Sequence, residues 1–178
     1  TQDITGTVLK ECDPSEITEE TAKKCIESFI GEYDQIPPMY SALKVNGKKL
    51  YELAREGKVV ERKSRKVQIY DIRIKEMKLP RIRMEVSCSK GTYIRTLCND
   101  VGEVLGVGGC MESLLRTKVS RFELKDSMKL ADIEKAKNEG RTEEIILPLD
   151  EVFVEYPKII VTGRQAQLAY NGNPFPKE

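Results

Sequence analysis

The residues best suited to chemistry lie at 89–97, where a predicted strand passes into a predicted helix. This stretch holds Lys90, Tyr93 and Arg95. A tyrosine ring can stack on a base, an arginine offers a planar fork of donors, and lysines can hold a phosphate backbone. The combination suits an anionic, planar ligand such as a nucleotide. On residue type alone, Tyr93 could equally be a half-buried structural aromatic and Arg95 a surface ion-pair partner.

Hydrophobic spacing predicts the two elements that would hold this stretch. On its N-terminal side, apolar residues alternate with polar ones, the pattern of a strand with one buried face. These apolar residues are Ile82, Met84, Val86 and Cys88. On its C-terminal side, the apolar positions follow helical spacing. They are Ile94, Leu97, Cys98, Val101 and Leu105. Thr92 is the predicted N-cap, which places Tyr93 and Arg95 in the first helical turn.

The remaining pattern predicts an α+β domain. Further strands are predicted at 1–9, 67–77, around Phe122 and at 158–161, with a β-bulge in the second of them near residues 70–71, where the apolar parity changes. Helices are predicted from Thr18 to a stop at Gly31, at 50–54 with Tyr51 and Arg55 on one face, at 131–139 and after Thr162. Asn46-Gly47 predicts a tight turn, and the three glycines at 106, 108 and 109 predict a tight or backbone-crowded connection. We expect a mixed, mostly antiparallel sheet with flanking helices and a cleft along one face.

Two domains are predicted, at 1–155 and 156–178. The second range holds one strand and one short helix, which cannot bury a core of their own. We therefore interpret it as the beginning of a domain that is cut off after Glu178. The chain opens at Thr1 within a predicted strand and without a methionine, so an N-terminal portion is also expected to be missing.

Charge is unevenly distributed along a chain whose net charge is only +1. Between residues 44 and 66 there are nine basic residues and three acidic ones. Such a segment could follow a phosphate backbone, although a solvated, lysine-rich surface has the same composition. Just before it, Pro37, Pro38, Met39 and Tyr40 form a rigid segment, typical of a surface loop but unusual as a simple linker.

Several classes of chemistry are excluded. The chain has no histidine, which rules out an internal histidine base, a Ser-His-Asp triad and any histidine-containing zinc site. Its five cysteines form no C-x-x-C motif and are interpreted as reduced, structural residues of an intracellular protein. No metal site is predicted, and no apolar run approaches the length of a membrane span.

Four segments together resemble the bacterial tRNA pseudouridine-55 synthase (TruB) family. Residues 1–6 resemble its T-x-D-x-x-G segment, and residues 114–117 match a later L-x-R stretch. The two longest matches are I-P-P-M-Y-S-A-L-K at 36–44, continued to residue 57, and C-S-K-G-T-Y-I-R-T-L at 88–97, continued to residue 106. The segments occur in the family's order and cover most of residues 1–125.

The resemblance implies an isomerase that converts one T-loop uridine of tRNA to pseudouridine in the cytoplasm, without metal or organic cofactor. An aspartate attacks the flipped nucleotide, the glycosidic bond breaks, and the uracil turns and rejoins through carbon. Arg95 would pair with that aspartate, Tyr93 would contact the target base and Leu114 would line an apolar wall. Lys90 and the 36–44 loop would lie near the T-stem-loop RNA, and we name Tyr40, Ser41 and Lys44 as the loop's binding residues.

The chain departs from the family at both ends. By the resemblance, residues 1–155 are part of the catalytic domain, and residues 156–178 begin a C-terminal, PUA-like RNA-binding domain that is truncated after Glu178. The family's nucleophilic aspartate lies in a G-x-L-D-P motif ahead of the T-x-D-x-x-G segment, and no such motif occurs here. Asp13 precedes Pro14 but lacks the surrounding glycines, so we reject it as the nucleophile. We therefore expect this polypeptide alone to be inactive. Sheet edges left open would favour an artefactual dimer or association with a companion N-terminal fragment.

Two other interpretations remain open. The chain could be a non-catalytic RNA-binding remnant of the same fold, which would keep half of the cleft. It could also be a structural α+β domain without a role in RNA binding. Salt-dependent binding to a T-stem-loop is expected of a synthase fragment and of an RNA-binding remnant, but not of a structural domain.

Overall fold

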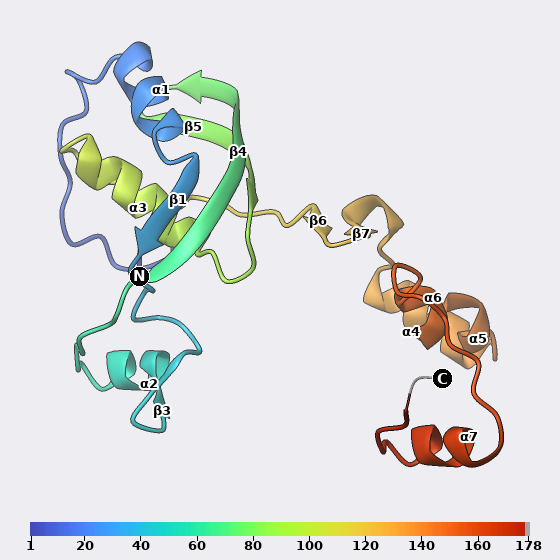
Figure 1. The fold of residues 1–178 in the computed structure, drawn as a ribbon. Coiled ribbons are helices and arrows are strands. Elements are labelled where there is room, and N and C mark those ends of the chain that lie inside the picture. The colour runs from blue at the N-terminus through green and yellow to red at the C-terminus, as the bar shows by residue number, and fades with distance from the viewer. Residues whose placement is uncertain (177–178) are drawn as a thin grey trace. The chain divides into compact units, whose positions relative to one another are not determined.

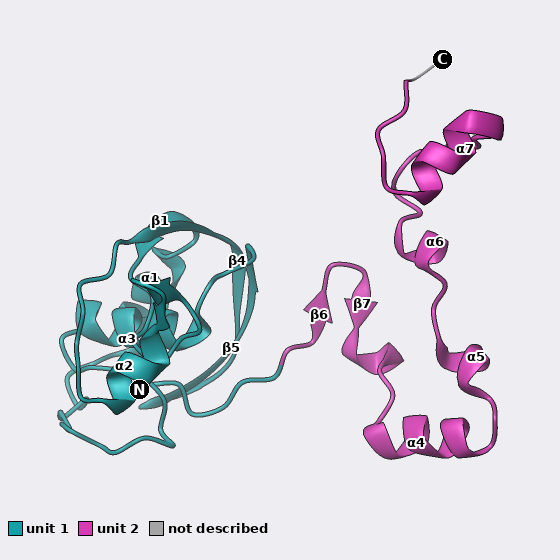
Figure 2. Ribbon diagram, turned by 90° about the horizontal axis from the view of Figure 1, so that it is seen from below, with its two compact units in different colours: residues 1–115 teal, residues 116–178 magenta. Residues whose placement is uncertain are grey.

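The computed structural model describes residues 1–176, which divide into two compact units (Figure 2). Unit 1 comprises residues 1–115, and unit 2 begins at Arg116. Each unit is described by itself. Among the described residues, no helix is both long and apolar enough to cross a membrane. Residues 1–176 also contain no cluster of three or more His, Cys, Asp or Glu side chains that could hold a metal ion.

Unit 1 is built on an antiparallel sheet in the order β1-β4-β5. The strands are β1 (Gly31–Gln35), β4 (Arg65–Lys78) and β5 (Arg81–Cys88), and long, curved β4 lies in the middle (Figure 1). The predicted bulge is confirmed, because the β4–β5 register shifts between Ile69 and Asp71. The bulge lets Ile69 and Ile72, three positions apart, both point into the core.

Two helices cover the buried face of this sheet, α1 (Glu19–Glu27) and α3 (Ile94–Val104) (Figure 1). Thr18 caps α1 as predicted, since its hydroxyl oxygen accepts a hydrogen bond from the Thr21 N–H at 3.2 Å. The helix ends at Glu27, before the predicted stop at Gly31, because residues 31–35 form β1 instead. The shared core consists of Cys25, Ile26, Ile69, Ile72, Leu97 and Val101.

A small lobe of unit 1 carries the hairpin of β2 (Lys44–Val45) and β3 (Lys48–Lys49) and the helix α2 (Leu50–Arg55). The predicted Asn46-Gly47 turn is confirmed: both residues have positive φ, 51° and 81°, the conformation that a two-residue hairpin turn requires. Leu50 is buried in this lobe. Tyr51 and Arg55 share a face as predicted, with the guanidinium carbon 5.3 Å from the ring centroid.

The glycine-rich segment after α3 packs directly against that helix, as its composition predicted. A Cβ atom on Gly102 would lie 2.1 Å from the Gly108 carbonyl carbon, and one on Gly109 would lie 2.5 Å from the Cys98 carbonyl oxygen. Only glycine allows backbones to approach so closely. This contact turns the chain back along α3 and leads it to Met111.

Unit 2 consists of short elements. They are β6 (Lys118–Val119), β7 (Phe122–Glu123), η1 (Leu124–Asp126), α4 (Leu130–Asn138), α5 (Thr142–Ile145), α6 (Leu149–Val152) and α7 (Gly163–Tyr170). The predicted short strand at Phe122 and the helices at 131–139 and after Thr162 are confirmed. Ala136 is the one buried apolar residue among those described in this unit.

Two predicted strands are wrong. Residues 1–9 form only an isolated bridge between Asp3 and Met111. The Asp3 carboxylate accepts hydrogen bonds from the N–H and hydroxyl of Thr5, and this local turn draws the chain out of an extended conformation. Residues 158–161 are irregular, because the described part of the chain offers them no partner strand.

Candidate nucleic-acid site at the start of helix α3

The turn between β5 and α3 is held by Ser89. Its N–H donates to the Gln68 carbonyl at 2.8 Å, and its hydroxyl accepts from the Gln68 N–H at 3.0 Å, which extends the sheet by one residue. Thr92 was the predicted N-cap, and this prediction is wrong. The Thr92 hydroxyl instead donates to the Ser89 carbonyl at 2.9 Å, inside the turn, and the N-cap is Tyr93. Arg95 therefore lies in the first turn of α3, whereas Tyr93 is the residue immediately before the helix.

Arg95 forms hydrogen bonds that connect three segments distant from one another in the sequence. Its guanidinium donates to the Tyr40 carbonyl at 2.8 Å and to the Thr1 carbonyl at 3.5 Å. These carbonyls belong to the 36–44 loop and the N-terminal segment, and Arg95 belongs to α3. The two hydrogen bonds occupy two of the five N–H donors of a guanidinium, so three remain for another acceptor.

The N-terminal segment is also held along α3 by Gln2. The Oε1 atom of Gln2 accepts from the buried Thr96 hydroxyl at 3.0 Å. Backbone bonds on the other side join this segment to Met111: the Ile4 N–H donates to the Met111 carbonyl at 2.9 Å, and the Met111 N–H donates to the Gln2 carbonyl at 3.1 Å. The start of the chain thus lies between α3 and the segment that leads to Leu114.

The carboxylate of Asp3 interacts electrostatically with the guanidinium of Arg95. Hydrogen bonds from the Thr5 N–H and hydroxyl hold the pKa of the Asp3 carboxyl below its usual range, and the positive charge of Arg95 lowers it further. Asp3 therefore stays ionised at neutral pH. It is the third residue of the T-x-D-x-x-G segment, for which the sequence suggested no role.

Gln35 was not predicted to be functional, yet it holds the backbone of Tyr93. Only 1% of its surface is exposed. Its Oε1 accepts from the Tyr93 N–H at 2.7 Å, its Nε2 donates to the Tyr93 carbonyl at 3.1 Å, and Nε2 also contacts the Tyr33 hydroxyl. The signal in the sequence was the position of Gln35 directly before Ile36-Pro37. Because the strand β1 was not predicted, the burial of the Gln35 side chain was missed.

Tyr40 and Ser41 come close to Arg95 through the 36–44 loop. Tyr40 is 39% exposed, whereas Ser41 is buried at 6% exposure. The Ser41 carbonyl accepts from the Tyr51 N–H at 3.1 Å, which attaches the loop to α2. The Ser41 hydroxyl is a buried polar group with no hydrogen-bond partner within residues 1–176.

A hollow of about 190 Å³ opens beside this loop. It is lined by Thr1, Gln2, Pro38, Met39, Tyr40 and Arg62. The Arg62 guanidinium donates to the Pro37 carbonyl at 3.0 Å, and its Nε is buried without a partner among the described residues. A larger hollow, about 580 Å³, lies by α1, but its charged lining is three glutamates against one lysine, an excess of negative charge that would repel a phosphate. These residues are Glu19, Glu20, Glu27 and Lys23.

The remaining predicted residues lie outside this cluster. Lys90 is exposed in the turn before Tyr93, and Lys44 is exposed on β2. Leu114 is 56% exposed in an irregular segment. The roles predicted for these three residues therefore stay predictions.

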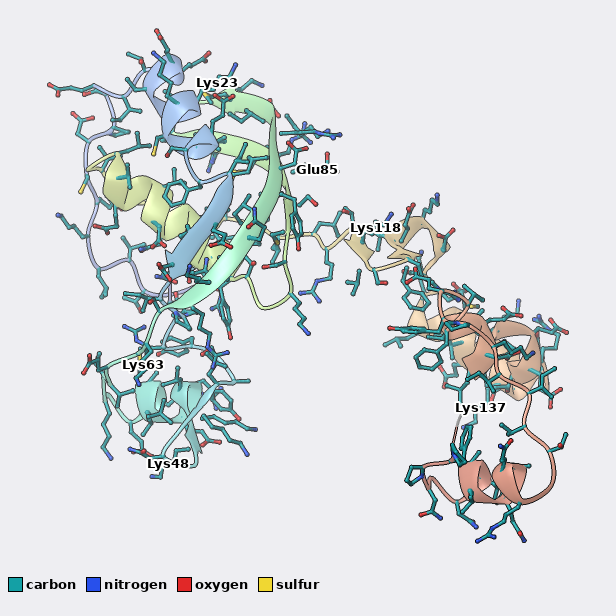
Figure 3. All side chains as sticks on the ribbon, viewed as in Figure 1. Lys23, Lys48, Lys63, Glu85, Lys118 and Lys137 are labelled. Carbon is teal, nitrogen blue, oxygen red and sulfur yellow. The ribbon has the colours of Figure 1, made fainter. Side chains whose placement is uncertain are left out.

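The basic segment at 44–66 surrounds α2 and is partly neutralised. Lys48 and Lys58 both pair with Glu56, at 3.5 and 2.7 Å, and Lys66 pairs with Glu32 at 3.4 Å. Lys48 and Lys63 project from opposite ends of the lobe (Figure 3). All three ion pairs are exposed, so each is weak and can exchange its partner for a phosphate.

Two family models cover most of the chain. The model described as TruB family pseudouridylate synthase (N terminal domain) matches residues 1–94, and that of the tRNA pseudouridylate synthase B C-terminal domain matches residues 95–154. The chain belongs to the TruB family. The border between the two models falls at the start of α3, whereas the compact units divide after residue 115. The predicted domain division at residue 155 stays a prediction.

Curated relatives agree with this membership of the TruB family. A tRNA pseudouridine synthase B of Lachnoclostridium phytofermentans is 49% identical over 161 residues, which are 86% of this chain and 52% of the relative. The protein of the same name from Clostridium tetani is 46% identical over 172 residues, 97% of this chain and 58% of the relative. The chain thus spans slightly more than half the length of these TruB proteins.

Solved structures confirm the fold. A chain in the crystal structure of a Cbf5-Nop10-Gar1 complex matches with a TM-score of 0.60 and 26% identity, over 76% of this chain and 39% of that chain. A chain in the structure of an H/ACA RNP bound to a substrate RNA containing 2'-deoxyuridine matches with a TM-score of 0.55 at 22% identity, over 76% and 37% of the two chains, and supports the fold alone. The predicted α+β fold is therefore confirmed.

Proposed function

We propose that this chain is part of a cytoplasmic tRNA pseudouridine synthase that isomerises the T-loop uridine at position 55 to pseudouridine. The bond between C1′ of the ribose and N1 of the uracil breaks, and a bond from C1′ to C5 replaces it. N1 gains a proton, and the hydrogen on C5 is released to water. The reaction is a net rearrangement and therefore needs no oxidant, reductant or organic cofactor.

One observation carries this proposal: the family's three longest matching segments meet at Arg95. Its guanidinium joins residue 95 to the carbonyls of residues 1 and 40. Those positions belong to segments that are far apart in the sequence. A purely structural resemblance would not require both segments to hydrogen-bond to the same side chain. Beside this cluster lie the half-buried Tyr93, a hollow and the buried Ser41 hydroxyl, which has no hydrogen-bond partner among the described residues.

The resemblance to the family supplies the residue roles of this proposal, and the arrangement supports the role of Arg95. Arg95, held by two backbone carbonyls, keeps three donors with which to bind the nucleophilic aspartate and keep it ionised. Tyr93, at the N-cap of α3, contacts the flipped base. The 36–44 loop and the lysines at 44 and 90 contact RNA phosphates, and Leu114 packs on the base. These contacts would recognise the T-stem-loop, whose target nucleotide must leave its stack to reach the site.

The proposed test uses two proteins and one substrate, a T-stem-loop RNA with tritium on C5 of its uridines. The first protein is the chain as given, which we expect to be inactive because its 178 residues hold no G-x-L-D-P motif. The second is a chimera in which the chain replaces the matching 172 residues of the Clostridium tetani relative. We expect this chimera to release tritium from the target uridine.

Matched arginine variants of the chimera connect activity to the site. We expect Arg95→Lys to lower the rate about a hundredfold, because a lysine cannot hold two carbonyls and a carboxylate in one plane. Arg73→Lys is the control, since Arg73 is an exposed β4 residue paired with Asp71 at 2.7 Å. Equal rates for Arg95→Lys and the parent chimera would contradict the role of Arg95.

Binding measurements separate the alternatives. A chimera without activity, combined with salt-dependent binding of the T-stem-loop by the chain, would favour a non-catalytic RNA-binding remnant. An inactive chimera and no salt-dependent binding would favour a structural domain. The Clostridium tetani relative is assayed alongside, so that an inactive chimera can be attributed to this chain.

A further inference from the structure

We infer that Gln35 is a positioning residue, which orients Tyr93 and Arg95 toward the nucleotide by clamping the Tyr93 backbone. The inference rests on the proposed function for its catalytic consequence, but the clamp itself can be tested without it. Gln35 does not touch the reacting nucleotide in this account, since its side chain is buried. It acts through the two residues that do.

The clamp is a pair of hydrogen bonds to one residue. The Gln35 Oε1 accepts from the Tyr93 N–H at 2.7 Å, and the Gln35 Nε2 donates to the Tyr93 carbonyl at 3.1 Å. The Tyr93 carbonyl also accepts the helical hydrogen bond from the Leu97 N–H at 3.0 Å, so Gln35 is a second donor to it. The Tyr93 N–H needs an acceptor, and this requirement determines the orientation of the Gln35 amide. A primary amide supplies both groups at the spacing of one residue, as a neighbouring strand would.

The clamp lies at a helix start whose N-cap residue, Tyr93, makes no capping hydrogen bond with its own side chain. No side chain among residues 1–176 caps the first turn of α3, because Thr92 points into the preceding turn. Tyr93 is the N-cap residue, so fixing its N–H and carbonyl sets the direction in which the Tyr93 ring leaves the backbone. Arg95 follows two residues later in the same turn, and its direction is set by the same constraint.

Burial shows why this position needs a glutamine. Gln35 is 1% exposed, at the end of β1, and a polar group so deeply buried is retained only when it is hydrogen-bonded. Its third contact, with the Tyr33 hydroxyl, holds the amide in place from its own strand. A residue needed only to fill this space could be apolar, because Phe29, Tyr33 and Ile94 already pack around the neighbouring core.

The first experiment measures the clamp in the chain as given. Amide hydrogen exchange is followed by NMR in the parent chain and in Gln35→Met, which keeps the side-chain volume but removes both hydrogen bonds. We expect the Tyr93 amide to exchange about tenfold faster in Gln35→Met, with β4 amides unchanged. Equal exchange of the Tyr93 amide in the two proteins would overturn the inference, whatever the chain's function.

The second experiment measures the catalytic consequence in the chimera. We expect Gln35→Met to lower kcat about tenfold to a hundredfold and to change KM less, because RNA affinity comes mainly from phosphate contacts that remain. Ile72→Val, a conservative core substitution in β4 beyond the residues that pair with β1, is the stability control and should leave kcat unaltered. An unchanged kcat in a Gln35→Met chimera whose Tyr93 amide has lost protection would also overturn the inference.

The third variant, Gln35→Glu, provides a pH signature that a purely structural role would not give. A protonated glutamic acid can still accept from the Tyr93 N–H and donate to the Tyr93 carbonyl, but a carboxylate cannot donate. Burial raises the pKa of a carboxyl group, so the protonated form is accessible at mildly acidic pH. We expect kcat relative to the parent chimera to recover as the pH falls, and a ratio independent of pH would contradict the clamp.

The groups around Gln35 allow this reading of the pH profile. Burial raises the pKa of Tyr33 to about 12 and that of Cys98 to about 11, so both stay protonated in the working range. Burial also raises the pKa of Asp100. Because the parent chimera carries the same groups, its own profile corrects for them. If the parent chimera is inactive, the proposed function fails while the exchange experiment still decides the clamp.

Discussion

Unit 1 and unit 2 differ in what they bury. In unit 1, Ile26, Leu50, Ile69 and Leu97 are at most 1% exposed. In unit 2, large apolar residues remain in contact with solvent, with Leu130 and Ile160 at 84% exposure and Leu149 at 78%. The difference lies in topology, because strand pairing in unit 1 brings distant apolar stripes together, whereas the elements of unit 2 pair only with near neighbours.

This comparison teaches where cooperative stability resides. Short helices are marginal in water without tertiary packing, and α5 and α6 have four residues each. Unit 1 should therefore account for the main unfolding transition of the chain. Substitutions at chemically equivalent positions of the two units should have unequal effects, and the predictions below test this.

The largest difference is expected between two isoleucines. Ile69 lies in β4 at 0% exposure. The Ile69→Ala substitution should lower the free energy of unfolding by about 3 kcal/mol, because it leaves a cavity where α1, α3 and the sheet meet. Ile160→Ala in unit 2 should change the free energy of unfolding by less than about 0.5 kcal/mol. Urea denaturation followed by circular dichroism measures both. Equal effects would mean that unit 2 has a core of its own.

The next effect concerns the close approach of backbones in unit 1. Gly102→Ala places a methyl group 2.1 Å from the Gly108 carbonyl carbon, and neither backbone can give way easily. We expect a loss of about 2 kcal/mol in unfolding free energy. Gly172 in unit 2 has open space within 4 Å but a φ of 68°, so Gly172→Ala strains the backbone locally without crowding unit 1 and should leave the midpoint of the main transition unchanged. A Gly102→Ala chain as stable as the parent would show that the 106–109 segment moves freely.

The elements of unit 1 that the sequence predicted are those with strong local periodicity. The β4–β5 hairpin, its bulge, α1, α3 and the Asn46-Gly47 turn are all confirmed. β1 was missed because its sequence, with Tyr33 as its one large apolar residue, carries little signal, and pairing with β4 determines it. The strand at 1–9 was wrongly predicted, because among the described residues this segment pairs only through one bridge, between Asp3 and Met111.

The candidate site was predictable to a similar extent. Tyr93, Arg95 and Tyr40 could be named from motifs, and the structure brings Arg95 and Tyr40 together. Gln35 could not be named, because its role depends on a contact with Tyr93, 58 residues away. A buried glutamine carries no periodic signal, and its partners are visible only after the chain has folded.

Two N-cap threonines give a smaller but sharper contrast. The Thr18 hydroxyl accepts from the Thr21 N–H at the start of α1, and Thr18→Ala should cost about 1 kcal/mol of stability. Thr162 occupies the same position in α7 but makes no capping bond with its side chain in the described structure. Thr162→Ala should therefore have an effect near zero in the same urea titration. A comparable loss at both positions would show that α7 is capped in solution.

The smallest predicted effect depends on pH and comes from Asp100, on α3. Burial raises the pKa of this carboxyl above its ordinary value of 3.8, the Asn99 amide opposes the shift and Glu103 adds to it. The folded chain therefore binds this proton more tightly than the unfolded chain does. The contribution of Asp100 to stability is most favourable below pH 3.8 and declines as the pH rises through the folded-state value.

Asp100→Asn should remove that decline. The variant should be more stable than the parent at pH 7, by less than about 1 kcal/mol because water screens a partly exposed carboxylate. The advantage should shrink as the pH falls toward 4, which urea midpoints measured at several pH values would reveal. Glu134→Gln on exposed α4 is the control from unit 2 and should leave the main transition unchanged at every pH. If Asp100→Asn instead destabilised the chain at neutral pH, the ionised carboxylate would have a stabilising partner in solution, and the two units would differ less in their electrostatics than in their cores.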